Sequence, residues 1–193
     1  MQLTREDFQK FLYTYNEDEL FYRTLYFEKK EHPETFHKFC LNLDCDLISR
    51  RQLYVPELQK EGWHSYFEEK AMFCDTADNI MLYKHYRYTP EFIHEHEFFE
   101  ILCIYDGQAH TSIQGIEHTL HKGDVCIIPP HTKHSIGIFD DSIAFNILIR
   151  GSTFQSTFFQ SLTEDSALAH FFAHVLYRKT EGNYLIFHTA NDP

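Results

Sequence analysis

The chain has 193 residues, of which 43% are hydrophobic and 17% are aromatic, and it carries a formal net charge of −12. This content of aromatic and hydrophobic residues excludes a disordered chain, and the length is sufficient for one domain with a real core. The acidic balance repels phosphate backbones, so this stretch by itself is unsuited to bind duplex DNA.

The cysteines and the hydrophobic runs bear on the cellular location. The chain has five cysteines, an odd number at irregular positions, which we interpret as free thiols in a reducing compartment. The amino end lacks the pattern of a signal peptide, and no apolar run approaches the ~20 residues needed to span a bilayer. We therefore expect a cytoplasmic protein with no membrane partner.

Residues 1–78 are predicted to form a helical amino-terminal region. Thr4 with Asp7, and Asn16 with Glu19, have the spacing of capping boxes, in which each side chain caps the backbone of the other residue. Hydrophobic side chains recur at helical spacing after each pair. The sequence leaves open whether this region packs on the next one or forms a separate lobe.

Residues 79–151 change to short runs of β-forming residues separated by turn signals. Asp106-Gly107 and Gln114-Gly115 are such turns. Seven or so short strands with tight connections predict a small antiparallel β-barrel. With helical patterns on both sides, the fold class is α+β. We expect strands within residues 80–88, 92–105, 109–113, 116–121, 125–128, 134–139 and 143–149.

Residues 152–193 return to a helical pattern between 153 and 178, followed by a short apolar segment. Phe158 and Phe159 belong to one hydrophobic stripe, and Phe171 and Phe172 to another. The chain then stops abruptly after an Asn-Asp-Pro turn. This favours a piece of a longer protein, with a natural terminus as the alternative.

A run of histidines and glutamates offers candidate metal ligands. His94, His96 and Glu100 occupy even positions, so a strand over residues 94–104 would project them from one face. His134, 38 residues after His96, would complete the set from a facing strand. Three imidazoles and a carboxylate suit a divalent transition metal, and the sequence does not choose among Fe, Mn, Ni, Cu and Zn.

Glycine and proline recur at fixed distances from these ligands. The first group reads H-x-H-x(3)-E-x(6)-G and ends at Gly107, and the second reads G-x(5)-P-x-H-x(2)-H from Gly123 to His134. With these motifs the chain resembles the cupin superfamily, whose fold is a small antiparallel β-barrel, the double-stranded β-helix. His131 stands where a glycine is usual and Ile138 where an asparagine is usual. These departures concern the turn rather than the ligand.

The order of a helical lead-in, a cupin barrel and an amphipathic helix pair is similar to the amino-terminal sensing half of AraC-type transcription regulators. Residues 90–102, PEFIHEHEFFEIL, and residues 123–135, GDVCIIPPHTKHS, resemble its two signatures. The resemblance covers roughly residues 80–190. It implies a small-molecule effector, a homodimer and a DNA-binding helix-turn-helix region. No segment here offers a basic recognition helix, so DNA is expected as a partner only through a part that is absent.

The resemblance also suggests residues for the effector and for dimerisation. Arg87 matches an arginine that contacts effectors in family members, and its guanidinium can bind a carboxylate or vicinal hydroxyls; a surface arginine is the alternative. Asn146 would face the barrel interior if even positions point inward, and Tyr83 and His85 share the parity of Arg87. Family members that sense sugars bind them inside the barrel, so a sugar-like metabolite is expected. The helices after the barrel commonly carry dimerisation, which would place Phe158, Phe159, Phe171 and Phe172 near an interface; the alternative is that they cover the barrel.

Two functions from different classes follow from this pattern. The first is an effector sensor. The second is a stand-alone metal-dependent cupin enzyme, such as a dioxygenase or a sugar isomerase, because four protein ligands leave coordination positions open for substrate. A catalytic acid or base beside the metal is missing, since Glu95 and Glu97 have the wrong parity. We therefore favour the sensor and assign no catalytic residue.

Overall fold

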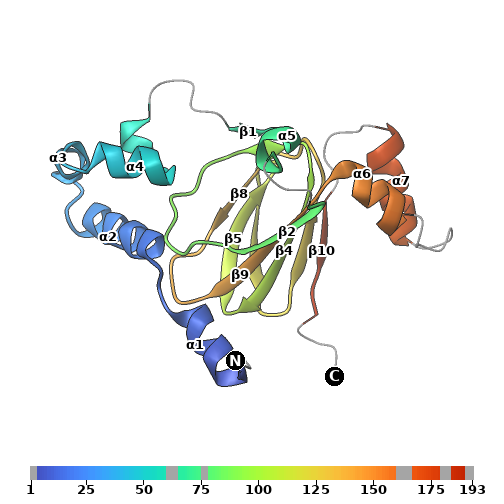
Figure 1. Ribbon diagram of the computed structural model, residues 1–193, viewed down its shortest axis with the longest axis horizontal. Helices are drawn as coiled ribbons and strands as arrows, with labels where there is room; N and C mark the ends of the chain where they lie inside the picture. Colours follow the sequence, from blue (N-terminus) through green and yellow to red (C-terminus); the bar gives the residue numbers. More distant parts are fainter. Residues whose placement is uncertain (1–3, 60–64, 75–77, 160–166, 179–183, 190–193) are drawn as a thin grey trace.

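The computed structural model describes residues 4–59, 65–74, 78–159, 167–178 and 184–189. In Figure 1 a β-barrel lies at the centre, with helices α1–α4 along one side and helices α6 and α7 on the opposite side. Within the described residues no helix is long and apolar enough to cross a membrane.

Local sequence signals start the first two helices. Helix α1 (Arg5–Tyr13) begins at Thr4, whose hydroxyl accepts a hydrogen bond from the Asp7 N–H while the Asp7 carboxylate accepts one from the Thr4 N–H. Helix α2 (Glu17–Glu31) begins in the same way at Asn16, with Glu19 as its partner. Both predicted capping boxes are therefore confirmed. Shorter helices follow: α3 (Phe36–Leu41), α4 (Cys45–Arg51), η1 (Pro56–Leu58) and α5 (Glu69–Met72).

Two antiparallel sheets make up the barrel. One has the strand order β10-β7-β4-β9-β2 and the other the order β6-β5-β8. Each predicted strand run contains one of these strands, whereas β10 lies in a run for which no strand was predicted. Their bounds are β2 (Ile80–Lys84), β4 (Phe99–Asp106), β5 (Gln108–Ile113), β6 (Ile116–His121), β7 (Val125–Ile128), β8 (His134–Gly137), β9 (Ile143–Ile149) and β10 (Leu185–Phe187).

A hydrophobic core fills the space between the two sheets. Along β4 the even positions Leu102 and Ile104 are buried in it, while Cys103 is only partly buried. Leu120 from the smaller sheet faces them and is fully buried. Burial of each such aliphatic side chain contributes about 1.5–3 kcal/mol. Alternation along β4 thus gives Glu100, two positions before Leu102, the same inward direction.

The turn between β4 and β5 requires its glycine. Gly107 has a φ of +74°, in the left-handed region that side chains rarely adopt. A Cβ at this position would also lie 2.0 Å from Ser142 Oγ, so the space beside the turn is taken. This turn carries the chain from β4 in the larger sheet to β5 in the smaller one.

The amino-terminal helices pack directly on the barrel. Tyr22, Leu25 and Phe36 share a buried cluster with Tyr88, which follows β2, and the side chain of Phe139, from the loop after β8, packs against it. Tyr26 and Phe139 stack with ring centroids 5.2 Å apart. The question that the sequence left open is therefore settled in favour of packing.

Two segments depart from the predicted secondary structure. The region before the barrel is not helical up to residue 75, because β1 (Tyr66–Phe67) is extended and pairs in parallel with β3 (Glu95–His96). The run 94–104 is not one strand either, since a bend at Glu97 and Phe98 separates β3 from β4. The pairing partner of β3 is about 30 residues away in the chain, so no local pattern announces it.

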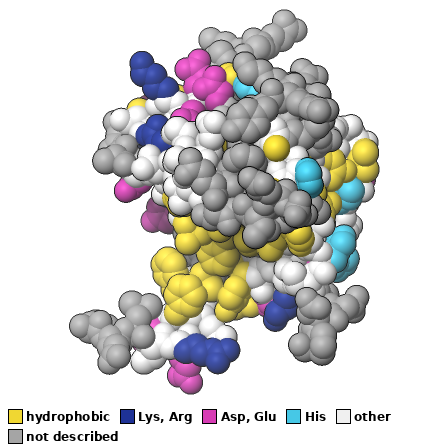
Figure 2. Space-filling model, turned by 90° about the vertical axis from the view of Figure 1, so that its right-hand side faces the viewer, with side chains coloured by type: hydrophobic (Ala, Val, Ile, Leu, Met, Phe, Trp, Pro, Cys, Tyr) yellow, Lys and Arg dark blue, Asp and Glu magenta, His cyan; other side chains and the backbone are white. Residues whose placement is uncertain are grey.

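The carboxy-terminal helices cover part of the outer side of the larger sheet. Helix α6 (Gly151–Thr153) continues into a π-helical segment, η2 (Phe154–Phe159), and α7 (Ala167–Arg178) follows. Phe154 stacks on Phe99 of β4 with centroids 3.9 Å apart, and Phe172 of α7 lies 4.4 Å from Phe154. Figure 2 views this side and shows hydrophobic side chains gathered on it.

Candidate metal and effector site

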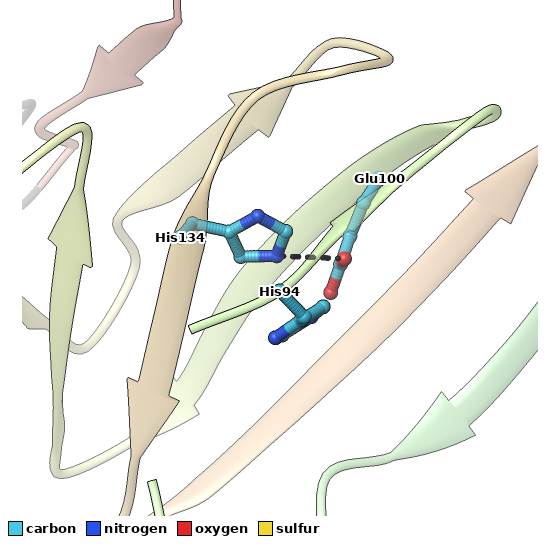
Figure 3. Close-up of side chains that lie close together, drawn as sticks. All are labelled: His94, Glu100 and His134. Atoms are coloured by element: carbon cyan, nitrogen blue, oxygen red, sulfur yellow. Dashed lines mark ion pairs between the residues drawn. The ribbon is translucent and has the colours of Figure 1, made fainter. Parts of the chain in front are cut away.

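Three of the four predicted metal ligands converge at one end of the barrel. The ligand atoms of His94, Glu100 and His134 all lie within 4.8 Å of one another. His94 reaches the group because its backbone bridges that of His134, with hydrogen bonds of 2.8 and 2.9 Å in both directions. Glu100 reaches it from β4, on the inward face of the strand. Figure 3 shows these three side chains pointing toward one another from separate parts of the barrel.

His96 lies beside this group rather than within it. Its Nε2 is 3.0 Å from Glu100 Oε2, and its ring stacks on Phe98 with centroids 4.3 Å apart. Its Nδ1 is buried and has no hydrogen-bond partner. The four predicted residues therefore lie close together, but only His94, Glu100 and His134 bring their ligand atoms to one point, and His96 contacts the group through Glu100.

Backbone carbonyls fix which ring nitrogens face the centre. His134 Nδ1 lies 2.9 Å from the carbonyl oxygen of Thr132, and His94 Nδ1 lies 3.2 Å from that of Phe92. A carbonyl only accepts, so each of these Nδ1 atoms carries a proton, which leaves Nε2 as the ring nitrogen that can bind a cation. Carbonyl contacts of this kind hold metal-binding histidines in their orientation.

The carboxylate of Glu100 lacks a full set of donors. His134 Nε2 lies 3.3 Å from Glu100 Oε2 without forming a hydrogen bond, and Glu100 Oε1 has no partner either. A neutral Nε2 and a carboxylate oxygen are both acceptors, so a proton or a cation between them is needed to stabilise the contact. The residues present therefore fit a divalent metal: buried nitrogen and oxygen atoms converge, and Glu100 Oε1 lacks a donor among the described residues.

The environment keeps these groups in the ionisation states that a metal requires. Burial lowers the pKa of His94 to about 3, with a smaller contribution from His134, so its ring is neutral near pH 7. Burial alone would raise the pKa of Glu100, but the neighbouring His134 and His96 outweigh it and hold that pKa well below its usual value. Neutral imidazole and ionised carboxylate are the forms that bind metals.

A cavity of about 370 Å³ opens next to this group. Three of the predicted effector residues line it: Tyr83, His85 and Asn146. The Asn146 amide donates to the Tyr83 hydroxyl at 3.2 Å, across the register pair that joins β2 to β9. Asn146 Oδ1 and His85 Nε2 are buried without partners. Burial also lowers the pKa of His85 to about 4, so this ring is a neutral hydrogen-bonding group.

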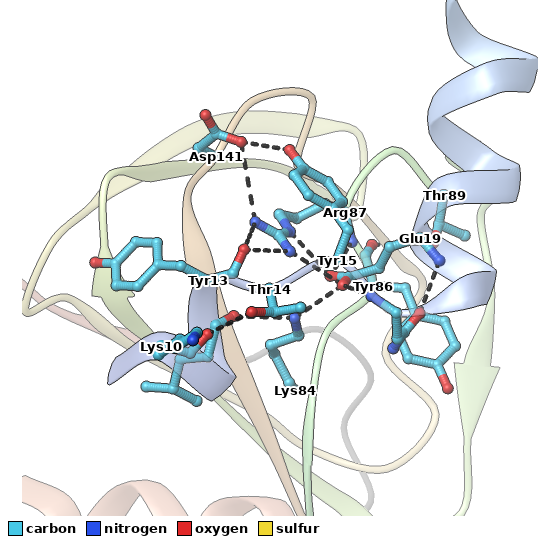
Figure 4. Close-up of polar contacts among 12 residues, drawn as sticks. Lys10, Tyr13, Thr14, Tyr15, Glu19, Lys84, Tyr86, Arg87, Thr89 and Asp141 are labelled. Carbon is cyan, nitrogen blue, oxygen red and sulfur yellow. Dashed lines mark hydrogen bonds and ion pairs between the residues drawn. The ribbon is translucent and has the colours of Figure 1, made fainter. Parts of the chain in front are cut away.

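Arg87 lies outside this cavity, contrary to the expectation that it contacts the effector. Its guanidinium binds the carboxylate of Glu19 through Nε at 2.9 Å and Nη2 at 3.0 Å, and lies over the ring of Tyr15 at 3.6 Å. Lys84 Nζ binds the same carboxylate at 2.9 Å. Figure 4 shows this network between the amino-terminal helices and the segment after β2. The expectation for Arg87 came from the family resemblance, and in this chain the carboxylate of Glu19 takes the position that an effector would have.

The four phenylalanines predicted at a dimer interface have different environments. The side chains of Phe158 and Phe159 lie outside the described residues. Phe172 is 3% exposed and packs against Phe99 and Phe154, so it covers the barrel. Phe171 is partly buried at the edge of the same cluster.

Several residues of the cavity wall were missed by the sequence analysis. Phe98 shares the even parity of His96 and Glu100, so the same pattern could have identified it. Phe92 shares this even parity within the predicted run 92–105, whereas Phe67 and Met72 carry no such signal. Phe67 reaches the cavity only because β1 pairs with β3. The cavity wall beside the histidines is therefore more apolar than the motifs indicate.

A barrel of two antiparallel sheets with inward histidines, a buried glutamate and an adjoining cavity defines a cupin ligand-binding domain. A family model described as the AraC-like ligand binding domain matches residues 81–183, more than half of the chain. The chain therefore belongs to the family of AraC-like ligand binding domains.

Curated relatives match over a shorter stretch. The HTH-type transcriptional activator RhaS of Yersinia pestis (strain Pestoides F) and that of Yersinia pseudotuberculosis serotype O:1b (strain IP 31758) are each 33% identical over 57 residues. The match covers 30% of this chain and 21% of each relative. The chain thus spans about a fifth of the length of the curated relatives it matches.

The solved structures that this chain matches include cupin proteins, each over part of the chain. KdgF from Halomonas sp. is 21% identical with a TM-score of 0.34, covering 37% of this chain and 70% of that protein. An RmlC-like cupin from Shewanella frigidimarina NCIMB 400 is 20% identical with a TM-score of 0.35, covering 38% and 68%.

Proposed function

We propose that this domain senses a small, sugar-like metabolite that binds in the barrel cavity with the help of a divalent transition metal. The observation that carries the proposal is the convergence of unpaired polar atoms on one cavity: Glu100 Oε1, His85 Nε2 and Asn146 Oδ1. Buried polar atoms without partners are rare in proteins, and a ligand that pairs with them removes the penalty.

His94, Glu100 and His134 would hold the metal, with His96 orienting the carboxylate of Glu100 from the side. A bound cation supplies a centre that attracts oxygen atoms of an effector, such as hydroxyls or a carboxylate. The chain's own part is to keep both Nε2 lone pairs pointed at the centre through the carbonyls of Thr132 and Phe92.

The remaining cavity wall suits a ligand with polar edges and an apolar face. Tyr83, His85 and Asn146 offer hydrogen-bonding groups on one wall, whereas Phe67 and Phe92 offer apolar surface on another. A sugar or sugar acid has both features, since its ring presents C–H groups on its faces and hydroxyls around its edge. This division also fits the general composition of small-molecule sites.

The carboxy-terminal helices are placed to respond to occupancy. Glu100 points into the cavity, and its neighbour Phe99 points outward and stacks on Phe154 of η2. A shift of β4 would therefore also displace Phe154 and the helical segment after the barrel. A ligand biases such a packing only through different affinities for its two states.

Homodimerisation and DNA binding complete the proposal. Phe171 is the described phenylalanine suited to an interface, because it remains partly exposed on α7. We expect Phe171→Ser to raise the dimer dissociation constant by about tenfold, measured by light scattering after size-exclusion chromatography. A wild-type protein that stays monomeric at millimolar concentration contradicts this part. DNA binding is expected only through a region outside these residues, which the reading frame after Pro193 would reveal.

Elemental analysis tests the metal. Protein purified without chelators is expected to contain a transition metal, and Glu100→Gln is expected to lose it, as is His94→Ala combined with His96→Ala. The matched control is Glu95→Gln, which is close in sequence but does not line the cavity. A metal content that is the same in Glu100→Gln and wild type would contradict the assignment.

A thermal-shift screen with sugars, sugar acids and amino acids tests the effector class. A ligand that binds only the folded state raises the midpoint of unfolding. We expect a sugar or sugar acid to do so in wild type, and Asn146→Leu to weaken its binding by about tenfold. If only amino acids stabilise the protein, the sugar-like class is wrong while the sensor proposal stands.

A further inference from the structure

A second cavity, of about 380 Å³, lies between the amino-terminal helices and the barrel. Helices α2 and α3 and the segment around η1 form one side, and the segment 88–91 with Phe139 forms the other. Of the residues that line it, Pro90 alone also lines the first cavity. The size falls within the range of small-molecule sites.

Aromatic rings make up much of its wall. Tyr26 stacks on Phe139 and lies 5.3 Å from Tyr88, centroid to centroid. Two of the chain's own ammonium groups already lie over such rings: Lys29 Nζ is 5.5 Å from the ring of Phe36, and Lys30 Nζ is 5.7 Å from that of Tyr26. Ring faces attract cations through their quadrupole, and this wall is used in that way within the protein.

The charged groups of the cavity leave one carboxylate without a cation. Lys29 binds Glu57 at 2.8 Å, so these two charges compensate each other. Glu91 forms no ion pair with any described residue, and its carboxylate lies over the backbone of Gly137, where a Cβ would come 2.0 Å from Oε1. Burial, and secondarily Glu117, raise the pKa of Glu91, whereas His110 acts in the opposite direction.

We propose that this cavity is a second binding site, which takes a small organic amine with a flat aromatic body. The rings of Tyr26, Tyr88 and Phe139 would receive the flat part, and Glu91 would pair with the ammonium. An anionic ligand is disfavoured, because Glu57 already neutralises the cation Lys29 and Glu91 adds a negative charge. The backbone at Tyr88 has a φ of +63°, a conformation that is held in place by burial of the ring and is common at ligand sites.

Titration calorimetry with tyramine tests the inference. Tyramine carries an aromatic ring and an ammonium, and 4-hydroxyphenylacetate carries the same ring with a carboxylate. We expect tyramine to bind the intact chain with saturation, and the anion to bind at least about fivefold more weakly. Saturation that is absent up to about 10 mM tyramine, or equal affinity for the anion, would overturn the proposal.

Variants locate the binding. Glu91→Gln is expected to weaken tyramine about threefold and to leave the affinity for the anion unchanged or higher. Tyr26→Leu, which keeps an apolar side chain, is expected to weaken it about fivefold. Tyr83→Phe, in the first cavity, should have no effect on tyramine. If Tyr83→Phe weakens tyramine and Glu91→Gln does not, the amine binds in the first cavity and the second site is refuted, while the metal and effector proposals are untouched.

Discussion

Two buried carboxylates, Glu19 and Glu100, differ in how completely their oxygens are paired with hydrogen-bond donors and cations. Glu19 is 0% exposed and receives Arg87 on both oxygens, Lys84 on one and the backbone N–H of Asn16 as well. Glu100 is 3% exposed and faces two imidazoles, with one oxygen lacking any partner. The first carboxylate is fully paired by permanent cations, and the second is surrounded by groups that are neutral when unprotonated.

This difference in pairing indicates that the charge of Glu19 serves the structure, and it supports the proposal that the charge of Glu100 binds a ligand. A buried carboxylate is tolerated when its oxygens are hydrogen-bonded and a cation lies beside it, as at Glu19. Glu100 is supported less completely, and a cavity lies next to it. We propose that the missing partner at Glu100 is the metal or effector. Perturbed, incompletely paired groups in a cleft are typical of functional sites.

The largest expected effect is that of Glu19→Gln. This change leaves the buried guanidinium of Arg87 with only the exposed carboxylate of Asp141, 3.9 Å away, as a counter-ion, so we expect the free energy of unfolding to fall by about 3 kcal/mol. Urea unfolding followed by circular dichroism at pH 7 measures it. Glu17→Gln is the control, since this glutamate is exposed, and its unfolding curve should match that of wild type. An equally stable Glu19→Gln protein would show that Glu19 is not the structural charge.

The difference in the free energy of unfolding between wild type and Glu19→Gln depends on pH. Burial opposes ionisation of Glu19, but hydrogen bonds from Arg87 and Lys84 outweigh it and lower its pKa below 4.5. Its stabilising contribution is therefore fully present above 4.5, the unfolded value, and is lost as the pH falls through the folded pKa. The difference between wild type and Glu19→Gln should narrow as the pH falls below about 4.5. A difference that stays constant down to pH 3 would contradict this reading of the cluster.

Glu100→Gln, unlike Glu19→Gln, should leave the stability of the metal-free protein almost unchanged and should abolish its stabilisation by metal. In metal-free buffer we expect its stability to be close to that of wild type, because the change removes a carboxylate that lacks one partner. Metal at about 100 times its dissociation constant should add about 2.7 kcal/mol to wild type and nothing to the variant. Thermal unfolding with and without Zn²⁺, Mn²⁺, Fe²⁺, Ni²⁺ and Cu²⁺ measures both. Equal stabilisation of the variant by metal would place the metal elsewhere.

Local patterns predicted the barrel because they act over few residues. Alternation along β4 placed Glu100, Leu102 and Ile104 inside, and the Asp106-Gly107 turn ended the strand where the structure ends it. The close approach of the predicted ligands was predictable for the same reason, because His94, His96 and Glu100 are close in the chain and share one parity. The capping boxes are likewise local signals.

Long-range partners were beyond the reach of such patterns. Arg87 can bind a ligand carboxylate or a protein carboxylate equally well, and nothing near it in the sequence reveals that Glu19, 68 residues earlier, takes that position. β1 was predicted as helix because its parallel pairing with β3 is a tertiary contact. The apolar wall formed by Phe67 depends on that same pairing, so the cavity's shape followed from it and not from the motifs.

The smallest expected effect sharpens the role of Arg87. Arg87→Lys keeps the charge but replaces a guanidinium that binds both oxygens of Glu19 by a single ammonium. The loss of one charge-assisted hydrogen bond should lower the free energy of unfolding by about 1.5 kcal/mol, less than for Glu19→Gln. Effector affinity, measured by calorimetry with a ligand from the thermal-shift screen, should stay unchanged, because the guanidinium does not line the cavity. If Arg87→Lys instead weakens effector binding as strongly as Asn146→Leu does, then Arg87 leaves Glu19 when the effector binds. In that case Glu19 and the effector compete for the guanidinium of Arg87.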